Sequence, residues 1–163
     1  YALATVSAHD NGLSYGVFFA MMRRHGFFVH ASTDFGSIGT TRGSCSKDGS
    51  IGGAAEKPYY SGNTAKSHYT VTAGAVHRLT RNLSLFEGIG YGRSAVAWQL
   101  AASEGGGYMQ NNGLTHKGVA GEAGALLSFG RIAVSASAVT IAGKQWQGSL
   151  GVGIKLWRDK NEK

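Results

Sequence analysis

The sequence predicts an all-β fold, a closed eight-stranded antiparallel up-and-down transmembrane β-barrel. Apolar residues alternate with small or polar residues from residue 67 to residue 157 with few interruptions. The breaks between the alternating segments differ systematically in length, and the segments themselves hold few charges. A period of two is typical of strands whose two faces meet different environments. Lipid outside and a narrow interior account for an apolar face and a face of small residues.

The alternation is clearest in one segment near the middle of the chain and one at its end. The apolar faces hold Leu83, Leu85, Ile89 and Tyr91 in the first segment, and Leu150, Val152, Ile154 and Leu156 in the second. The opposite faces hold Ser84, Gly88, Gly90 and Gly92, then Ser149, Gly151 and Gly153. A half-buried strand of a water-soluble protein would place larger polar residues on its second face. Glycine and serine there indicate that space is short.

Eight segments are predicted as strands from this alternation and from breaks at Gly, Asn, Asp and charged residues. In chain order they are residues 1–8, 12–22, 27–35, 66–78, 83–100, 116–129, 132–141 and 146–157. The first has the weakest pattern, because alanines compete with Leu3 for the lipid face. The fifth is too long for a membrane, so its part from Ser94 to Leu100 should project outward. The barrel domain is assigned to residues 1–157, followed by a polar tail, 158–163.

The connections between these segments place both ends of the chain on one side of the barrel. Tight turns at 23–26, 79–82 and 130–131 fall at every second connection, so they share one end. Long loops at 36–65 and 101–115 fall at the other end. Barrels of the outer membrane have this asymmetry, with short periplasmic turns and long external loops.

The longest loop is the predicted recognition surface. Residues 36–65 are polar and rich in Gly and Ser, and they include Cys45, Tyr59 and Tyr60. Loops of this length inside a compact domain are usually functional or disordered. We therefore expect partners to bind at the loop end of the barrel.

The composition argues against several classes of protein. No run of about 18 apolar residues is present, so no transmembrane helix is predicted. The single Cys45 cannot form an internal disulfide, and no Cys/His spacing resembles a zinc site, so no metal or cofactor is expected. The net charge of +7 permits anionic partners. Because the basic residues lie at the ends of the segments, they favour outer-membrane lipid or lipopolysaccharide over nucleic acid.

Three stretches resemble a known family. Residues 69–92, 117–124 and 148–157 are similar to the small eight-stranded outer-membrane barrels of the outer membrane protein X and W type. More narrowly, they resemble outer-membrane barrel proteins of unassigned function from Bacteroidota. The resemblance implies the fold and a place in the bacterial outer membrane, with periplasmic termini and extracellular long loops. It implies no activity.

The last strand resembles the sorting signal that such barrels present to the barrel-assembly machinery during insertion. That signal has a polar residue, a glycine and two spaced hydrophobic residues before an aromatic residue. Ser149, Gly151, Ile154 and Leu156 occupy these places, and Trp157 follows them. The tail 158–163 departs from the pattern, since such chains usually stop at the aromatic residue.

Polar residues on the interior face are predicted to form a network in the lumen. They are Glu122, Lys155, His30 and Asp34. A charge enclosed in the lumen needs a partner or water. Eight-stranded barrels are filled by side chains, so a solute pore is not expected. No catalytic residue and no metal ligand is assigned.

Glu87 is the exception to the pattern. It shares the apolar face with Leu85 and Ile89, so a regular strand would direct its carboxylate toward lipid at a cost in free energy. Either a β-bulge at Phe86 or Gly88 turns it inward, or this face contacts another protein. The bulge is the favoured interpretation.

The predicted function is a non-enzymatic outer-membrane barrel, a structural or accessory subunit of a larger complex with other outer-membrane proteins. One alternative is an acyltransferase or protease at the external rim that uses His9, Asp10, Ser67 and His68, although no Gly-X-Ser-X-Gly motif accompanies them. Another is a soluble lipocalin- or avidin-like barrel that binds a small ligand.

Overall fold

The computed structural model describes residues 1–52 and 57–156 of the chain. The described elements are ten strands and one short 3-10 helix, η1 (Ala102–Glu104). The strands are β1 (Ala2–His9), β2 (Gly12–Met22), β3 (His25–Thr33), β4 (Thr41–Cys45), β5 (Tyr60–Arg78), β6 (Leu83–Leu100), β7 (Tyr108–Asn111), β8 (His116–Phe129), β9 (Ile132–Ile141) and β10 (Gln145–Ile154). Trp157 and the predicted tail 158–163 lie outside the described residues.

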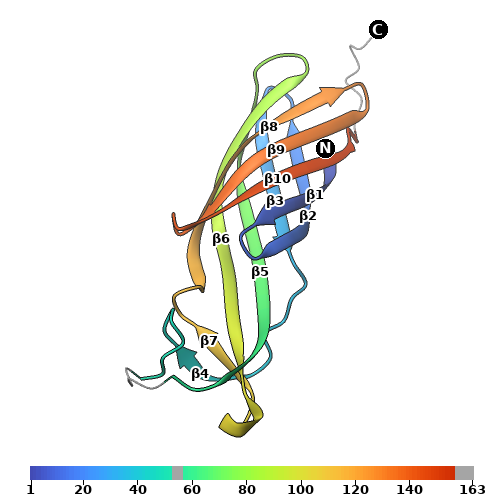
Figure 1. Cartoon of the computed structure of the whole chain (residues 1–163). Helices are drawn as coiled ribbons and strands as arrows, with labels where there is room; N and C mark the ends of the chain where they lie inside the picture. The colour runs from blue at the N-terminus through green and yellow to red at the C-terminus, as the bar shows by residue number, and fades with distance from the viewer. Residues whose placement is uncertain (53–56, 157–163) are drawn as a thin grey trace.

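Eight of these strands close into an antiparallel barrel (Figure 1). Around the ring they follow the order β1, β2, β3, β5, β6, β8, β9 and β10, and β10 pairs with β1. Each of the eight predicted segments overlaps one of these strands. The predicted fold is therefore confirmed.

The two faces of the strands differ as the alternation predicts. Large apolar side chains cover the outside, and many of them are exposed, such as Val6, Val17, Ile89, Val119 and Leu150 at 46 to 74%. Eight of the buried polar residues in the described part of the chain are serines, most of them on the inner face. An apolar exterior around a partly polar interior is the reverse of a water-soluble barrel.

Three phenylalanine rings fill the lumen near the tight turns. Phe18, Phe28 and Phe86 are at most 2% exposed, and their ring centroids lie 4.9 to 5.3 Å apart. Glycines on neighbouring strands make room for them, because a Cβ at Gly88 would lie 2.8 Å from Phe28 and one at Gly124 would lie 2.6 Å from Phe86. The small inner residues thus accommodate these rings.

An extension projects from the loop end of the barrel. β6 pairs with β8 only as far as Ser94, and β3 pairs with β5 only as far as Tyr69. Beyond these points β5 and β6 continue as a hairpin, and β7 and β4 are added to the edge of β6 (Figure 1). We call the projecting parts of β5 and β6, with β4, β7, η1 and their connections, the extension.

The extension confirms one prediction about the loops and changes another. As expected, the end of β6 from Ser94 onward projects beyond the barrel. The segments 36–65 and 101–115, however, are more than loops, because they contain β4, β7 and the start of β5. β3 also ends at Thr33, two residues earlier than predicted, and Phe35 adopts the left-handed conformation with φ of 56°.

Candidate functional site

A buried polar network lies in the lumen, centred on a carboxylate from β8. Glu122 Oε1 lies 2.8 Å from His30 Nδ1 and accepts a hydrogen bond of 2.8 Å from the Ser137 hydroxyl. The Thr72 hydroxyl donates to Glu122 Oε2, and His30 Nε2 lies 3.0 Å from Thr5 Oγ1. Glu122 and His30 are 4% and 2% exposed. Every polar atom of this pair therefore has a partner, as a buried charged group requires.

The network contains two of its four predicted members. Glu122 and His30 are brought together, but Asp34 follows the end of β3 at the loop end, where it accepts a hydrogen bond from the Gly36 amide at 2.8 Å. Lys155 follows the end of β10 at the opposite end, where its amide donates to the Arg131 carbonyl at 2.8 Å. The alternation along a strand predicts which face a residue lies on, but not its depth along the barrel. The predicted network therefore combined residues from both ends of the barrel.

The lumen hydroxyls Thr5, Thr72 and Ser137 were not singled out by the sequence. Each lies on the inner face of its strand and bonds to His30 or Glu122. Their inward parity was readable from the alternation. The choice of partner was not, because it depends on how five strands, β1, β3, β5, β8 and β9, face one another around the lumen.

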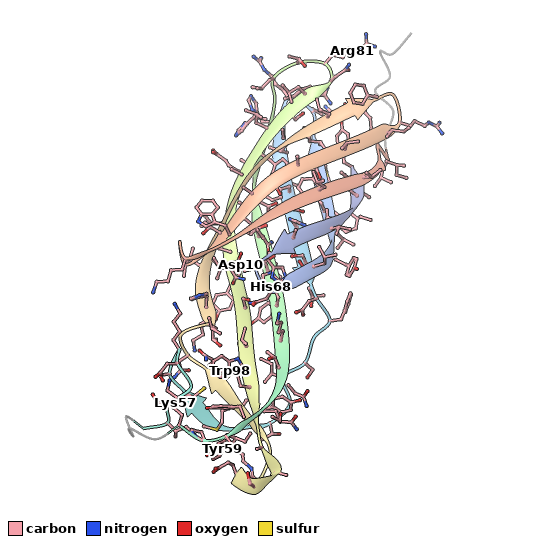
Figure 2. All side chains as sticks on the ribbon, in the orientation of Figure 1. Asp10, Lys57, Tyr59, His68, Arg81 and Trp98 are labelled. Carbon is pink, nitrogen blue, oxygen red and sulfur yellow. The ribbon has the colours of Figure 1, made fainter. Side chains whose placement is uncertain are left out.

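The residues of the possible rim enzyme do not form a catalytic triad. His9 and His68 stack at 4.1 Å where the barrel meets the extension, and Asp10 lies nearby in Figure 2. Ser67 precedes His68 on the same strand, so its side chain points to the opposite face. Neither ring nitrogen of His68 has a hydrogen-bond partner among the described residues. A nucleophile, a base and an orienting group are therefore not in hydrogen-bond contact here.

The extension has a small hydrophobic core of its own. Cys45, Leu100 and Met109 are 2 to 7% exposed, and Tyr60 and Trp98 pack against them. The Tyr60 hydroxyl donates to the Gly49 carbonyl at 2.7 Å, and the Tyr60 and Trp98 rings lie 5.4 Å apart. Burial of this hydroxyl, with a further contribution from Cys45, raises the pKa of Tyr60 to about 12.

The predicted recognition residues therefore have different environments. Tyr59 is 76% exposed and is available to a partner, whereas Cys45 is buried and Tyr60 is half-buried. The placement of Cys45 on a recognition surface was wrong, because its thiol packs against β6 and β7. Lys57 and Tyr59 lie on the far side of the extension from the barrel (Figure 2).

The loop after β4 is organised around Asp48. Its carboxylate accepts hydrogen bonds from the Ser46 and Ser50 hydroxyls and forms an ion pair with Lys57 at 3.1 Å. Hydrogen bonds from Ser46 and then Lys57 hold the pKa of Asp48 far below its usual value. The loop is thus built from short-range polar contacts at an exposed surface.

We expect the Cys45 thiol to be protected from modification in the folded protein. Because it lies in the extension core, a maleimide should react with it about 100-fold more slowly than after unfolding. A matched control is Ser37→Cys in a Cys45→Ala background, since position 37 is exposed and should react rapidly. Equal rates for the two thiols in the folded protein would contradict a packed extension.

Glu87 lies on the outer face of the barrel. The registers of β6 with β5 and with β8 run without interruption through Phe86, Glu87 and Gly88. Glu87 is exposed and lies between Ala75 and Ala123 on the neighbouring strands. The expected bulge is therefore absent and that interpretation was wrong, because the ladder stays regular and directs this carboxylate outward.

Two cations meet at the loop-end edge of the apolar face. Arg93 on β6 lies directly opposite Lys117 on β8, and the next outward residues below them are Tyr91 and Val119. The Arg93 guanidinium donates to the Gln110 side chain at 3.2 Å. Like charges placed opposite each other across two strands repel. This edge therefore favours an anion.

The described part of the chain contains neither a cluster of metal-binding side chains nor a helix that could span a membrane. Residues 1–52 and 57–156 contain no group of three or more His, Cys, Asp or Glu side chains that could hold a metal ion. None of the helical structure in the same residues is long and apolar enough to cross a membrane.

Neither a protein-family model nor a curated protein matches this sequence. Among solved structures, the chain is similar to Ail, the attachment invasion locus protein of Yersinia pestis, at 15% identity and a TM-score of 0.55, over 94% of this chain and 92% of Ail. Ail in complex with the heparin analogue sucrose octasulfate matches at 16% identity, with the same TM-score of 0.55 and the same coverage of 94% and 92%. Neisserial surface protein A is similar at 13% identity and a TM-score of 0.42, over 94% of this chain and 90% of that protein. The likeness to Ail supports the eight-stranded barrel fold.

Proposed function

We propose that the protein is a non-enzymatic integral barrel of the bacterial outer membrane that binds partners through its extension. One observation carries the proposal: β5 and β6 form part of the barrel and continue beyond it into the extension, which has a hydrophobic core of its own. The extension would be extracellular and the tight turns periplasmic. The filled lumen supports binding over transport, because three phenylalanine rings occupy its turn end.

A membrane location is tested by solubility and gel mobility. The protein should require detergent for extraction, and the folded barrel should migrate differently from the boiled chain in a denaturing gel. The apolar exterior supports this expectation and argues against the soluble lipocalin- or avidin-like alternative. A protein that stays soluble without detergent would refute the proposal. The resemblance of residues 69–92, 117–124 and 148–157 to Bacteroidota barrels stays a prediction from the sequence.

Recognition by the extension is tested by site-specific photocrosslinking on intact cells. A photoreactive residue at Tyr59 should capture an extracellular or outer-membrane partner, because this side chain is 76% exposed at the extension. The same probe at Ile89, 74% exposed on the barrel wall, is the matched control and should react with lipid. Identical products from both positions would contradict recognition by the extension.

A lateral partner within the membrane is a second candidate, and it would make the barrel an accessory subunit of a larger complex. The outward carboxylate of Glu87 supports it, because a charge on a lipid-facing wall is destabilising unless it is paired. The residues beside it, Ala75 and Ala123, are small and would let another protein approach closely. The partner would carry a Lys or Arg at the same depth.

Glu87→Leu tests this lateral contact. We expect the variant to keep its heat-dependent gel shift but to lose a partner that copurifies with the wild-type barrel in mild detergent. Ile89→Leu, two positions along on the same face, is the control and should retain the partner. If Glu87→Leu is more stable and copurifies with the same proteins, its carboxylate faces lipid only.

Two further partners follow from the location. The Arg93 and Lys117 pair would bind phosphate groups of lipopolysaccharide, since it borders the apolar face at the loop end. The assembly machinery would recognise β10, in which Ser149 is buried and Ile154 is 54% exposed, with the half-exposed Leu156 just beyond it. Trp157, the last residue of that signal, lies outside the described residues.

A further inference from the structure

The turn end of the barrel holds a concentration of positive charge that the proposed function does not use. Its cations are Arg23, Arg24, Arg78, Arg81, Arg131 and Lys155. The described carboxylates lie elsewhere: Asp10, Asp34, Asp48 and Glu104 at the loop end and in the extension, Glu122 in the lumen, and Glu87 on the outer wall of β6. The loop end has side chains of both positive and negative charge, whereas the described tight turns have only positive ones.

These cations surround the barrel. The Arg78 amide donates to the Arg24 carbonyl at 2.9 Å, which joins the β2–β3 turn to the end of β5. The Lys155 amide donates to the Arg131 carbonyl, which joins the β8–β9 turn to the end of β10. Arg81 lies in the turn between β5 and β6, at the end of the molecule remote from Lys57 and Tyr59 (Figure 2). The charge is therefore distributed around the rim.

The ring borders the apolar wall directly. Arg131 lies between Phe129 and Ile132, which are 58% and 57% exposed, and Arg23 lies two residues after Met21, which is 60% exposed. Long cationic side chains at such positions extend their stems over apolar surface and place their charges in the layer of lipid headgroups. In a membrane, the exposed cations of the ring would therefore lie at the height of the phosphates.

We propose that the exposed cations Arg23, Arg24 and Arg131 of this ring bind the phosphate groups of anionic phospholipids in the leaflet next to the turns. The inference rests on the proposed membrane-spanning barrel. A ring fits lipid better than an acidic protein, because lipid headgroups surround the whole rim whereas a docked protein would meet one side of it. Each cation near an anionic surface strengthens binding about fivefold at low salt, and salt screens the effect.

The test compares lipid selectivity of three proteins in vesicles of phosphatidylcholine. Spin-labelled phosphatidylglycerol and phosphatidylcholine report the relative association constant of the two lipids at the barrel surface. The turn-end variant combines Arg23→Gln, Arg24→Gln and Arg131→Gln, all at exposed positions. The control removes the same charge from the extension with Arg42→Gln, Lys47→Gln and Lys57→Gln, which lie beyond the barrel.

We expect the wild type and the extension variant to prefer phosphatidylglycerol, and the turn-end variant to have a constant at least about fivefold lower. The preference of the wild type should disappear in about 1 M NaCl, where the Debye length is about 3 Å. Equal constants for all three inserted proteins would overturn the inference and leave an acidic protein as the partner of the ring. Failure of the wild type to insert would instead refute the membrane-spanning barrel, and this inference with it.

Discussion

Replacing Glu122 with leucine is expected to lower the free energy of unfolding by about 3–5 kcal/mol. The substitution removes the acceptor that His30, Thr72 and Ser137 share, and it leaves their donors buried without a partner. Unfolding in urea from lipid vesicles, followed by tryptophan fluorescence and by gel mobility, measures the loss. The barrel should still close, because the register of β8 with β6 and β9 is made by the backbone.

Two further variants separate the network from a general effect of charge. Glu104→Leu removes an exposed carboxylate in η1, so the free energy of unfolding should change by less than about 0.5 kcal/mol. The double variant His30→Leu with Glu122→Leu should lose less stability than Glu122→Leu alone, since it removes the unpaired imidazole as well. A double variant less stable than the single one would contradict the pairing.

Gly90→Ala is expected to prevent correct pairing of β5 and β6, or to destabilise the barrel by about 3 kcal/mol or more. A Cβ at this position would overlap the carbonyl oxygen of Val71 and lie 2.7 Å from Thr72 Cα, and neither backbone group can rotate away. The backbones of β5 and β6 thus approach each other closely at this position, which a glycine permits. The fraction of protein showing the folded gel mobility after refolding into detergent measures the effect.

Gly148→Ala is the matched control for Gly90→Ala. Gly148 also lies inside a barrel strand, but a Cβ there would meet nothing within 4 Å. We expect a neutral effect or a gain of about 0.5–1 kcal/mol, because alanine reduces the conformational entropy of the unfolded chain. Equal damage from both substitutions would show that the barrel tolerates no side chain at its glycines, whatever the space around them.

The barrel was predictable because the alternation within each strand is visible in neighbouring residues of the sequence. A period of two fixes which residues face outward, and the outward apolar residues of β10 and β6 are exposed as that period requires. The inward direction of His30 and Glu122 followed from the same parity. Their contact did not, because it depends on how β3 and β8 face each other across the lumen.

The extension was not predictable for the opposite reason. β4 has no alternation of apolar and polar residues, and it pairs in parallel with β7, which pairs in turn with the projecting edge of β6. That edge exists only because β6 continues past the end of β8. Cys45 is buried by Leu100 and Met109, which are distant in sequence, so its glycine- and serine-rich surroundings wrongly indicated exposure.

The bulge predicted at Glu87 is absent because the average cost of a lipid-facing carboxylate does not decide the conformation of one strand. A carboxylate facing lipid is unfavourable, and a bulge would avoid that cost, but a bulge breaks the ladder on both sides of β6. The continuous pairing of β6 with β5 and β8 shows that the regular strand is retained. The exception to the pattern is therefore a property of the outer surface.

The length of the projecting hairpin determines which charges lie close to the proposed recognition surface. Residues 64–68 of β5 continue in regular pairing with β6 beyond the last pairing with β3 at Tyr69, and a strand from Thr64 to Tyr69 spans about 17 Å. At physiological ionic strength the Debye length is about 8 Å. The surface around Tyr59 thus lies about two screening lengths from the barrel rim. A partner bound there would respond more strongly to the charges of the extension than to those of a membrane around the barrel.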